Sequence, residues 1–175
     1  MNIVLIGFMA SGKTSVGRRL ASRLGYPFVD TDSLIEKQAG LSITGVFSMH
    51  GETVFREMET VVARELKNLK SCVISTGGGL PITPGNLDLL REAGLVVFLK
   101  ADPEDLVQRL QRDVRRPKVQ EGDPRETVMK LYAERIPIYT QADMVIETNG
   151  KSLNRVTGEV IANLAEVAAA KRSTG

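Results

Sequence analysis

Short, continuously apolar segments alternate along the chain with longer segments whose apolar residues recur at helical spacing. The apolar runs occupy residues 3–6, 28–29, 72–74, 95–99 and 144–146. Because strands that are apolar at every position are covered on both faces, these runs predict a parallel sheet. The alternation favours right-handed crossovers, and so an α/β fold with a doubly wound sheet of about five parallel strands flanked by helices.

The segments between the strands predict helices. Val16, Leu20 and Leu24 lie on one face of a helix that ends at Gly25. Further helices are expected at about 33–39, 43–68, 84–93, 103–111, 124–139 and 153–170.

The length of 175 residues suits one domain, residues 1–175, with enough apolar sequence for a core. We expect two inserts in it, because one stretch between strands is purely helical and another is irregular and charged. The first is a helical substrate-binding insert at about 31–62, and the second is a lid at about 111–124.

The composition of the chain bears on its binding partners and on its location in the cell. A net charge of +2 with 5% aromatic residues does not indicate a nucleic-acid surface. There is no long apolar stretch and no basic leader, so we expect a cytoplasmic protein without a membrane partner. We also expect a monomer. With only one cysteine, Cys72, and one histidine, His50, a His/Cys metal site is excluded. We expect Cys72 to be a buried thiol and His50 to lie in a loop or at a helix end.

The stretch GFMASGKT, residues 7–14, matches the phosphate-binding pattern G-x-x-x-x-G-K-[ST] between a buried strand and a helix. Its two pattern glycines allow a tight turn whose amides converge on phosphate oxygens, and Lys13 is expected to reach the β- and γ-phosphates. Thr14 is expected to bind Mg²⁺ through its hydroxyl. The pattern predicts binding of a nucleoside triphosphate with Mg²⁺, and the residues expected to bind it are Gly7, Ala10, Ser11, Gly12, Lys13, Thr14 and Ser15.

Two acids in FVDTD end the second strand, at the sheet edge where α/β proteins bind ligands. Alternate residues of an extended strand share a face, so both carboxylates can point into one crevice. We assign Asp30 to magnesium through water, and Asp32 to the acceptor hydroxyl as orienting group and general base. The alternative is that one of the two caps the helix beginning near Ser33.

A glycine run and two arginines complete the acceptor side. Gly77, Gly78 and Gly79 follow a buried strand and can present free amides to a ligand, although a plain flexible turn is the alternative. Arg56 lies among apolar residues and needs an anion, which an internal ion pair with Glu59 could supply instead of a substrate. Arg135 precedes a proline expected to end its helix, and its alternative is a solvated surface arginine.

A basic face follows the fourth strand. Arg109, Arg112 and Arg116 are spaced three and four residues apart, which places them on one face if the helix continues. Such a run is often solvated surface, but beside a phosphate it can act as a lid that excludes water.

Several motifs together resemble shikimate kinase, a member of the nucleoside-monophosphate-kinase-like P-loop fold. They are GFMASGKTSVGRRLA, FVDTDSLIEKQAG, GETVFREMET, STGGG, RRP and AERIPIYTQAD, and they extend from residue 3 to about 148. The phosphate loop is common to many families, whereas DTD, FRE and STGGG in this order are more specific.

The resemblance implies phosphoryl transfer from ATP to the 3-hydroxyl of shikimate in aromatic amino-acid biosynthesis. It implies that Lys13 and Arg116 stabilise the transferred group, that Thr14 and Asp30 serve magnesium, and that Arg109 stacks on adenine. The implied shikimate-binding residues are Asp32, Arg56, Gly78, Arg135, Phe47 and Phe55, with Gly77 and Gly79 beside them.

Two positions depart from the family pattern. The expected lid reads RPKV from Arg116 onward, where RPLL is common in the family. In the phosphate loop, Ala10 replaces a glycine that is common in the family. We expect the alanine to fit, because it lies outside the two pattern glycines. The competing functions are a gluconate or nucleoside-monophosphate kinase, and a nucleotide switch. The switch would need the strings NKxD and DxxG, which do not occur.

Overall fold

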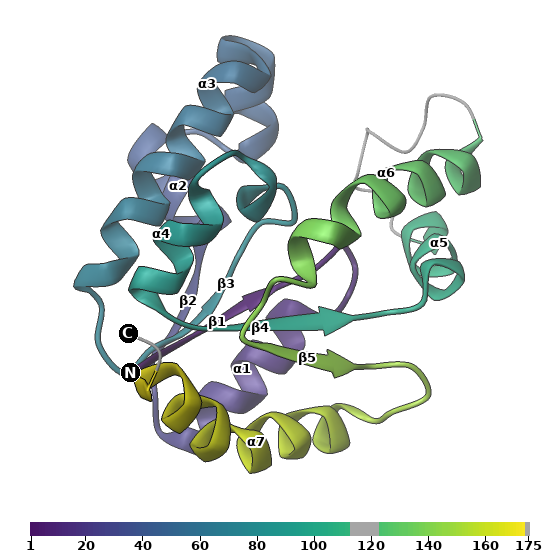
Figure 1. Cartoon of the computed structure of the whole chain (residues 1–175). Coiled ribbons are helices and arrows are strands. Elements are labelled where there is room, and N and C mark those ends of the chain that lie inside the picture. The colour runs from purple at the N-terminus through teal and green to yellow at the C-terminus, as the bar shows by residue number, and fades with distance from the viewer. Residues whose placement is uncertain (113–122, 174–175) are drawn as a thin grey trace.

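The computed structural model describes residues 1–112 and 123–173 (Figure 1). Its centre is a five-stranded parallel sheet in the order β2-β3-β1-β4-β5, which confirms the predicted fold class. The strands are β1 Asn2–Ile6, β2 Phe28–Asp30, β3 Val73–Ser75, β4 Gly94–Lys100 and β5 Met144–Glu147.

The helices occupy the segments with helical spacing. They are α1 Lys13–Leu24, α2 Thr31–Ala39, α3 Ile43–Glu65, α4 Asn86–Ala93, α5 Pro103–Arg112, α6 Pro124–Tyr139 and α7 Leu153–Ser173, with 3₁₀ turns η1 Leu66–Asn68 and η2 Leu80–Ile82. Gly51, at a φ of +80°, interrupts α3. His50 therefore ends the first part of α3, as expected.

α6 has the predicted range of 124–139, but the expectation that Pro137 ends this helix was wrong. The helix continues through Pro137 to Tyr139, and the amide of Thr140 donates to the carbonyl of Ile136 at 3.0 Å. Proline's fixed φ is itself helical, so near a helix end it removes one hydrogen bond without preventing another turn. Arg135 consequently lies within the helix and not at its terminus.

Helices cover both faces of the sheet (Figure 1). All residues of β1 are buried, and they alternate between two cores. Ile3 and Leu5 pack with residues of α1 and α7, whereas Val4 and Ile6 pack with residues of α3, α4 and α6. Because every β1 position is covered, the strand is continuously apolar instead of alternating.

The parallel register brings the carboxyl ends of three strands together. Ser75 of β3 pairs with Leu5 of β1 on one side and with Asp30 of β2 on the other. The segments that follow these strands therefore leave from the same edge, where open α/β sheets bind ligands. Cys72, just before β3, is 6% exposed, which confirms the buried thiol.

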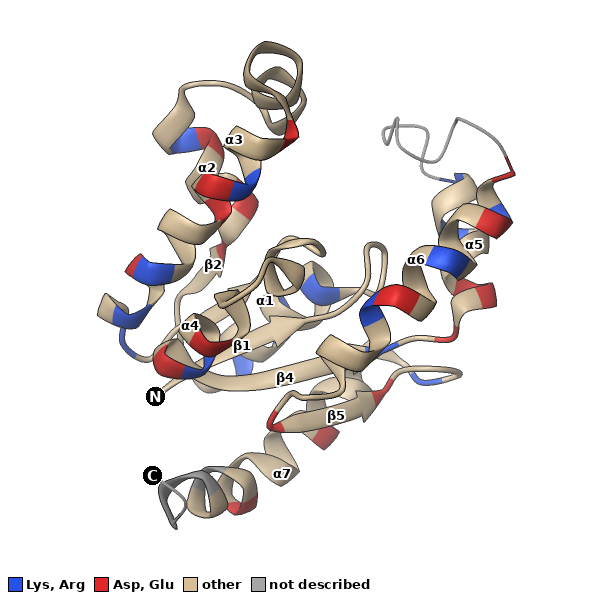
Figure 2. Cartoon of the chain, turned by 45° about the horizontal axis from the view of Figure 1, so that its top comes forward, with Lys and Arg blue, Asp and Glu red and all other residues tan. Residues whose placement is uncertain are grey.

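Charged residues of both signs are interspersed along the helices (Figure 2). Exposed pairs such as Lys67 with Glu92 and Lys100 with Glu147 join oppositely charged groups. Within residues 1–112 and 123–173, no helix combines the length and apolar character required to cross a bilayer.

Candidate active site

The phosphate loop connects β1 to α1 and is held by close backbone contacts. A Cβ on Gly7 would lie 2.8 Å from the carbonyl oxygen of Leu99, so this position has no room for a side chain. Gly12 has a φ of +93° and precedes the first turn of α1, where exposed amides and the helix dipole favour an anion. Lys13 is 8% exposed, and its Nζ donates to the carbonyls of Gly7 and Phe8, both at 2.8 Å.

Ala10 adopts the left-handed conformation with a φ of +62°. Alanine does fit at this position, as expected, although a Cβ in this conformation costs about 1–2 kcal/mol relative to glycine. The carbonyl of Ala10 accepts a hydrogen bond from Arg109 Nη1 at 3.1 Å. Arg109 thus lies against the phosphate loop. Arg116 and most of the expected lid lie outside the described residues.

Asp30 and Asp32 are connected by the N-terminal cap of α2 and do not lie side by side on an extended strand. Asp30 Oδ1 accepts from the amides of Asp32 at 3.0 Å and Ser33 at 3.4 Å, so Asp30 is the capping residue. Asp32 belongs to the first turn of α2. The argument that both acids share one face of an extended strand was therefore wrong, because the chain turns into α2 directly after Asp30.

The two acids nevertheless line one cleft with the phosphate loop. The cleft has a volume of about 210 Å³ and is lined by Met9, Ala10, Gly12, Lys13, Thr14, Ser15, Asp30, Asp32, Ser75, Thr76, Gly77 and Gly78. Mg²⁺ prefers oxygen ligands such as hydroxyls and carboxylates. Because water and phosphate oxygens fill most of its coordination positions, Mg²⁺ needs only one or two ligands from the protein. The described residues contain no group of three His, Cys, Asp or Glu side chains that could enclose a metal by themselves.

The glycine run after β3 packs closely against its neighbours on several sides. A Cβ on Gly77 would lie 2.6 Å from Asp32 Oδ1, and one on Gly79 would overlap the guanidinium of Arg56. The amide of Gly77 donates to Thr31 Oγ1 at 2.9 Å, a contact that sequence reasoning missed. These contacts show that the glycines allow close packing against neighbouring residues. A plain flexible turn would not need glycine for this reason.

Arg56 forms the internal ion pair considered as an alternative. Its guanidinium is 2.6 Å from Glu59 and 3.0 Å from Glu52, and the Glu59 side chain is only 1% exposed. Burial raises the pKa of Glu59, while the hydrogen bond from Arg56 acts in the opposite direction. The carboxylates of Glu52 and Glu59, together with the adjacent Gly79, hold the Arg56 guanidinium beside the glycine run.

Arg135 is not a solvated surface residue. Its guanidinium lies over the ring of Phe8, 5.5 Å from the centroid. Its Nη1 atom is buried and makes no hydrogen bond to any part of the chain that the structure describes. Since a buried guanidinium N–H left without an acceptor is costly, this atom indicates an anionic ligand.

Two further predicted residues come together on α3. The rings of Phe47 and Phe55 are 4.5 Å apart, on either side of the break at Gly51. Phe55 is 5% exposed and belongs to the core, and the Phe47 ring packs against that core. Phe55 also lies 5.4 Å from the guanidinium carbon of Arg56, so the aromatic pair borders the arginine.

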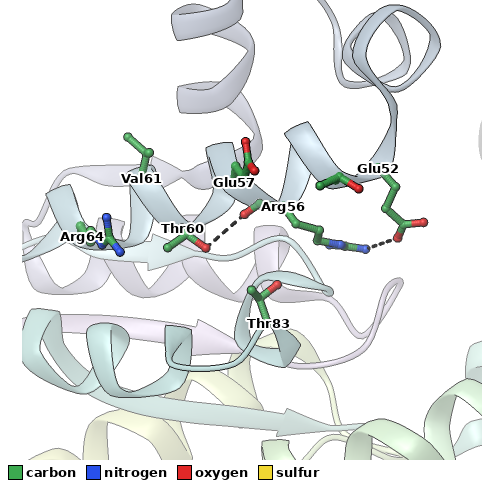
Figure 3. A pocket seen from close by; sticks show the side chains of 8 residues that line it. Glu52, Arg56, Glu57, Thr60, Val61, Arg64 and Thr83 are labelled. Atoms are coloured by element: carbon green, nitrogen blue, oxygen red, sulfur yellow. Dashed lines mark hydrogen bonds and ion pairs between the residues drawn. The ribbon is translucent and has the colours of Figure 1, made fainter.

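A larger hollow of about 550 Å³ runs along α3 toward Thr83 (Figure 3). Arg56, Thr60 and Arg64 line it, yet the Arg56 guanidinium points towards Glu52 and away from Arg64 in this view. The hollow lacks the phosphate-loop residues that line the smaller cleft. The smaller cleft is therefore the candidate active site, since it joins the phosphate loop to the acids.

The fold and this cleft define a P-loop protein of the phosphoryl-transfer class. A phosphate loop ending in Lys13 and Thr14 lines one cleft with an acid, Asp32, and partly buried arginines lie beside the glycine run that borders this cleft. Comparison with known proteins specifies the class further. The family model described as shikimate kinase matches residues 9–165, so the chain belongs to the shikimate kinase family.

Relatives cover nearly the whole chain. It is 46% identical over 159 residues to a shikimate kinase of Geobacter sulfurreducens, with 91% of this chain and 88% of the relative covered. It is 41% identical over 160 residues to one of Caldanaerobacter subterraneus subsp. tengcongensis, with 91% and 94% covered. The family suggested by the sequence motifs is confirmed.

Solved structures agree with this membership. A shikimate kinase of Acinetobacter baumannii, in complex with shikimate, superposes with a TM-score of 0.88 at 38% identity and 94% and 93% coverage of the two chains. A gluconokinase of Sinorhizobium meliloti superposes with a TM-score of 0.61 at 18% identity, covering 99% of this chain and 97% of its own. At that identity the second likeness concerns the fold alone.

Proposed function

We propose that this protein transfers the γ-phosphoryl group of ATP to the 3-hydroxyl of shikimate, giving shikimate 3-phosphate and ADP. The observation that carries the proposal is one cleft in which Lys13 and Thr14 face Asp32. The family uses ATP with Mg²⁺, and the similar Acinetobacter baumannii enzyme is described in complex with shikimate. A small polyol with a carboxylate suits one acid and two arginines.

The nucleotide is held at the phosphate loop. Amides from Gly7 to Ser15, with Ala10, Ser11 and Gly12 between them, bind the phosphates, and Lys13 leaves its carbonyl partners for the β- and γ-oxygens. Thr14 and the second carboxylate oxygen of Asp30, the latter through water, would hold Mg²⁺, which when bound would neutralise charge on the phosphates. Arg109 stacks on adenine, and Arg116 reaches the transferred group from a lid at about 111–124.

The acceptor is held on the opposite side of the cleft. Arg56 and Arg135 bind the shikimate carboxylate, which supplies the anion that the buried Arg135 Nη1 atom requires. Gly77, Gly78 and Gly79 border the acceptor with their backbone. The insert at about 31–62 contributes Asp32 as well as Phe47 and Phe55, which line the pocket.

Asp32 carries the proton chemistry. Its carboxylate accepts the proton of the attacking hydroxyl as the bond from that oxygen to the γ-phosphorus forms. The bond between the γ-phosphorus and the bridging oxygen breaks, and ADP leaves with that electron pair. Lys13 and Arg116 stabilise the equatorial oxygens during this exchange. Residues 1–175 act as one domain and one monomer in the cytoplasm, without a nucleic-acid or membrane partner.

A coupled assay of ADP release tests the assignment. Shikimate is expected to support turnover, while gluconate and nucleoside monophosphates give only the background ATPase rate. In the same assay Asp32→Asn is expected to lower kcat by about 10²–10⁴-fold, because it removes the base but leaves ATP binding intact. Turnover with gluconate but not shikimate would establish the alternative kinase, and a near-normal Asp32→Asn rate would remove the base role.

A further inference from the structure

Tyr139 is a fully buried polar residue at the end of α6, and no role described above uses it. The residue is 0% exposed, and its ring stacks on Phe98 of β4 with 5.2 Å between centroids. Its hydroxyl donates to the carbonyl of Gly78 at 2.6 Å. Burial raises the pKa of Tyr139 to about 12, so the phenol remains a protonated donor at neutral pH.

Gly78 is held from its other side by the phosphate loop. A Cβ on Gly78 would lie 3.2 Å from the amide nitrogen of Met9 and 3.5 Å from the carbonyl of Gly7. The backbone of the glycine run is therefore fixed between a phenol on α6 and the backbone that binds phosphate. This is a direct contact between the acceptor side and the nucleotide side of the cleft.

We infer that Tyr139 is a positioning residue that sets the place of the Gly77–Gly79 loop relative to the phosphate loop. It acts through Gly78 and touches neither substrate. Arg135 lies four residues earlier, on the same face of α6, so this helix supplies both a ligand for the acceptor and the anchor of the acceptor loop. The inference rests on the proposed function, because it assumes that the glycine run borders the acceptor.

Tyr132 offers a matched control on the same helix. Its hydroxyl donates to the carbonyl of Ala101 at 3.2 Å, at the segment before α5 and not at the glycine run. Tyr139→Phe and Tyr132→Phe each remove one hydroxyl and one hydrogen bond to a main-chain carbonyl. The experiment measures kcat and KM for shikimate and for ATP in both variants, with thermal unfolding and binding of a fluorescent ATP analogue.

For Tyr139→Phe, we expect kcat/KM for shikimate to fall about tenfold, in line with one lost hydrogen bond, with KM for ATP within about twofold of wild type. Tyr132→Phe is expected to leave kcat/KM for shikimate and KM for ATP unchanged, although it loses a similar amount of thermal stability. Equal changes in the two variants, or equal changes for both substrates, would overturn the inference. If wild type shows no activity with shikimate, the proposed function fails first and independently.

Should Tyr139→Phe not fold, Phe98→Leu provides the second test. This substitution keeps the phenol and its hydrogen bond to Gly78 but removes the ring that stacks on it, so the phenol ring is held less firmly. A loss confined to the shikimate parameters supports the positioning role. Unchanged shikimate parameters in a folded Phe98→Leu protein contradict it.

Discussion

Replacing Gly77 by alanine is expected to disable the acceptor side while leaving the fold intact. Gly77 does not have a positive φ, so its backbone accepts alanine without strain. The new Cβ would lie 2.6 Å from Asp32 Oδ1, whereas ordinary contact begins at 3.4 Å. The carboxylate must therefore retreat by 3.4 − 2.6, or about 0.8 Å, and Glu59 Oε1 at 3.3 Å from the same Cβ restricts the other side.

A misplacement of about 1 Å at a reacting group lowers the rate by about 10²-fold. We therefore expect Gly77→Ala to reduce kcat with shikimate by about two orders of magnitude, with KM for ATP within about twofold of wild type. The overpacking costs about 1–3 kcal/mol of stability, which thermal unfolding measures on the same sample.

Gly158→Ala on α7 is the matched control. Its Cβ would meet Arg23 Nη1 at 3.9 Å, an ordinary contact, so activity is expected to be unchanged and stability to rise by about 0.5–1 kcal/mol. A folded Gly77→Ala enzyme with the kcat of wild type would refute the reasoning, because the position of the Asp32 carboxylate would then be unimportant.

Three further predictions follow from single residues. Ala10→Gly relieves about 1–2 kcal/mol of left-handed strain but costs about 0.4–1 kcal/mol through the greater conformational entropy of the unfolded chain. Urea unfolding is therefore expected to show a net gain of up to about 1.6 kcal/mol in the free energy of unfolding, and a loss would contradict the strain. The folded pKa of Tyr139 is about 12 against 10 unfolded, so its stabilisation is complete below pH 10 and disappears as pH rises through 12. The stability advantage of wild type over Tyr139→Phe is expected to fall by up to about 3 kcal/mol across that window, and a constant difference would disprove the shift. Arg56→Ala is expected to weaken shikimate binding by about 2–5 kcal/mol, measured by calorimetry, whereas Arg64→Ala on the same helix does not; equal affinities would leave Arg56 a purely internal ion pair.

The strands and helices could be predicted because their patterns are local. Continuous apolar runs and helical spacing are properties of adjacent residues, so β1, β4 and α1 lie close to their expected bounds. The phosphate loop was equally predictable, because its glycines and Lys13 form one uninterrupted string between a strand and a helix. What that string does not indicate is backbone conformation, such as the left-handed φ of Ala10.

The acceptor side was harder to predict because its contacts join distant residues. The hydrogen bond from Tyr139 spans 61 positions and that from Gly77 to Thr31 spans 46, and no local pattern signals either one. The acids were expected in one crevice, and they do line one cleft, but through the helix cap at Asp30 instead of strand alternation. The roles of these side chains stay predictions until they are measured.

The most direct test of the account follows the transferred group itself. The enzyme is supplied with shikimate, Mg²⁺ and ATP labelled at the γ-phosphoryl group, and the products are separated and identified by mass spectrometry. The account predicts that the label appears on shikimate, one labelled group for each ADP formed. Label that accumulates in inorganic phosphate while shikimate remains unmodified would contradict it.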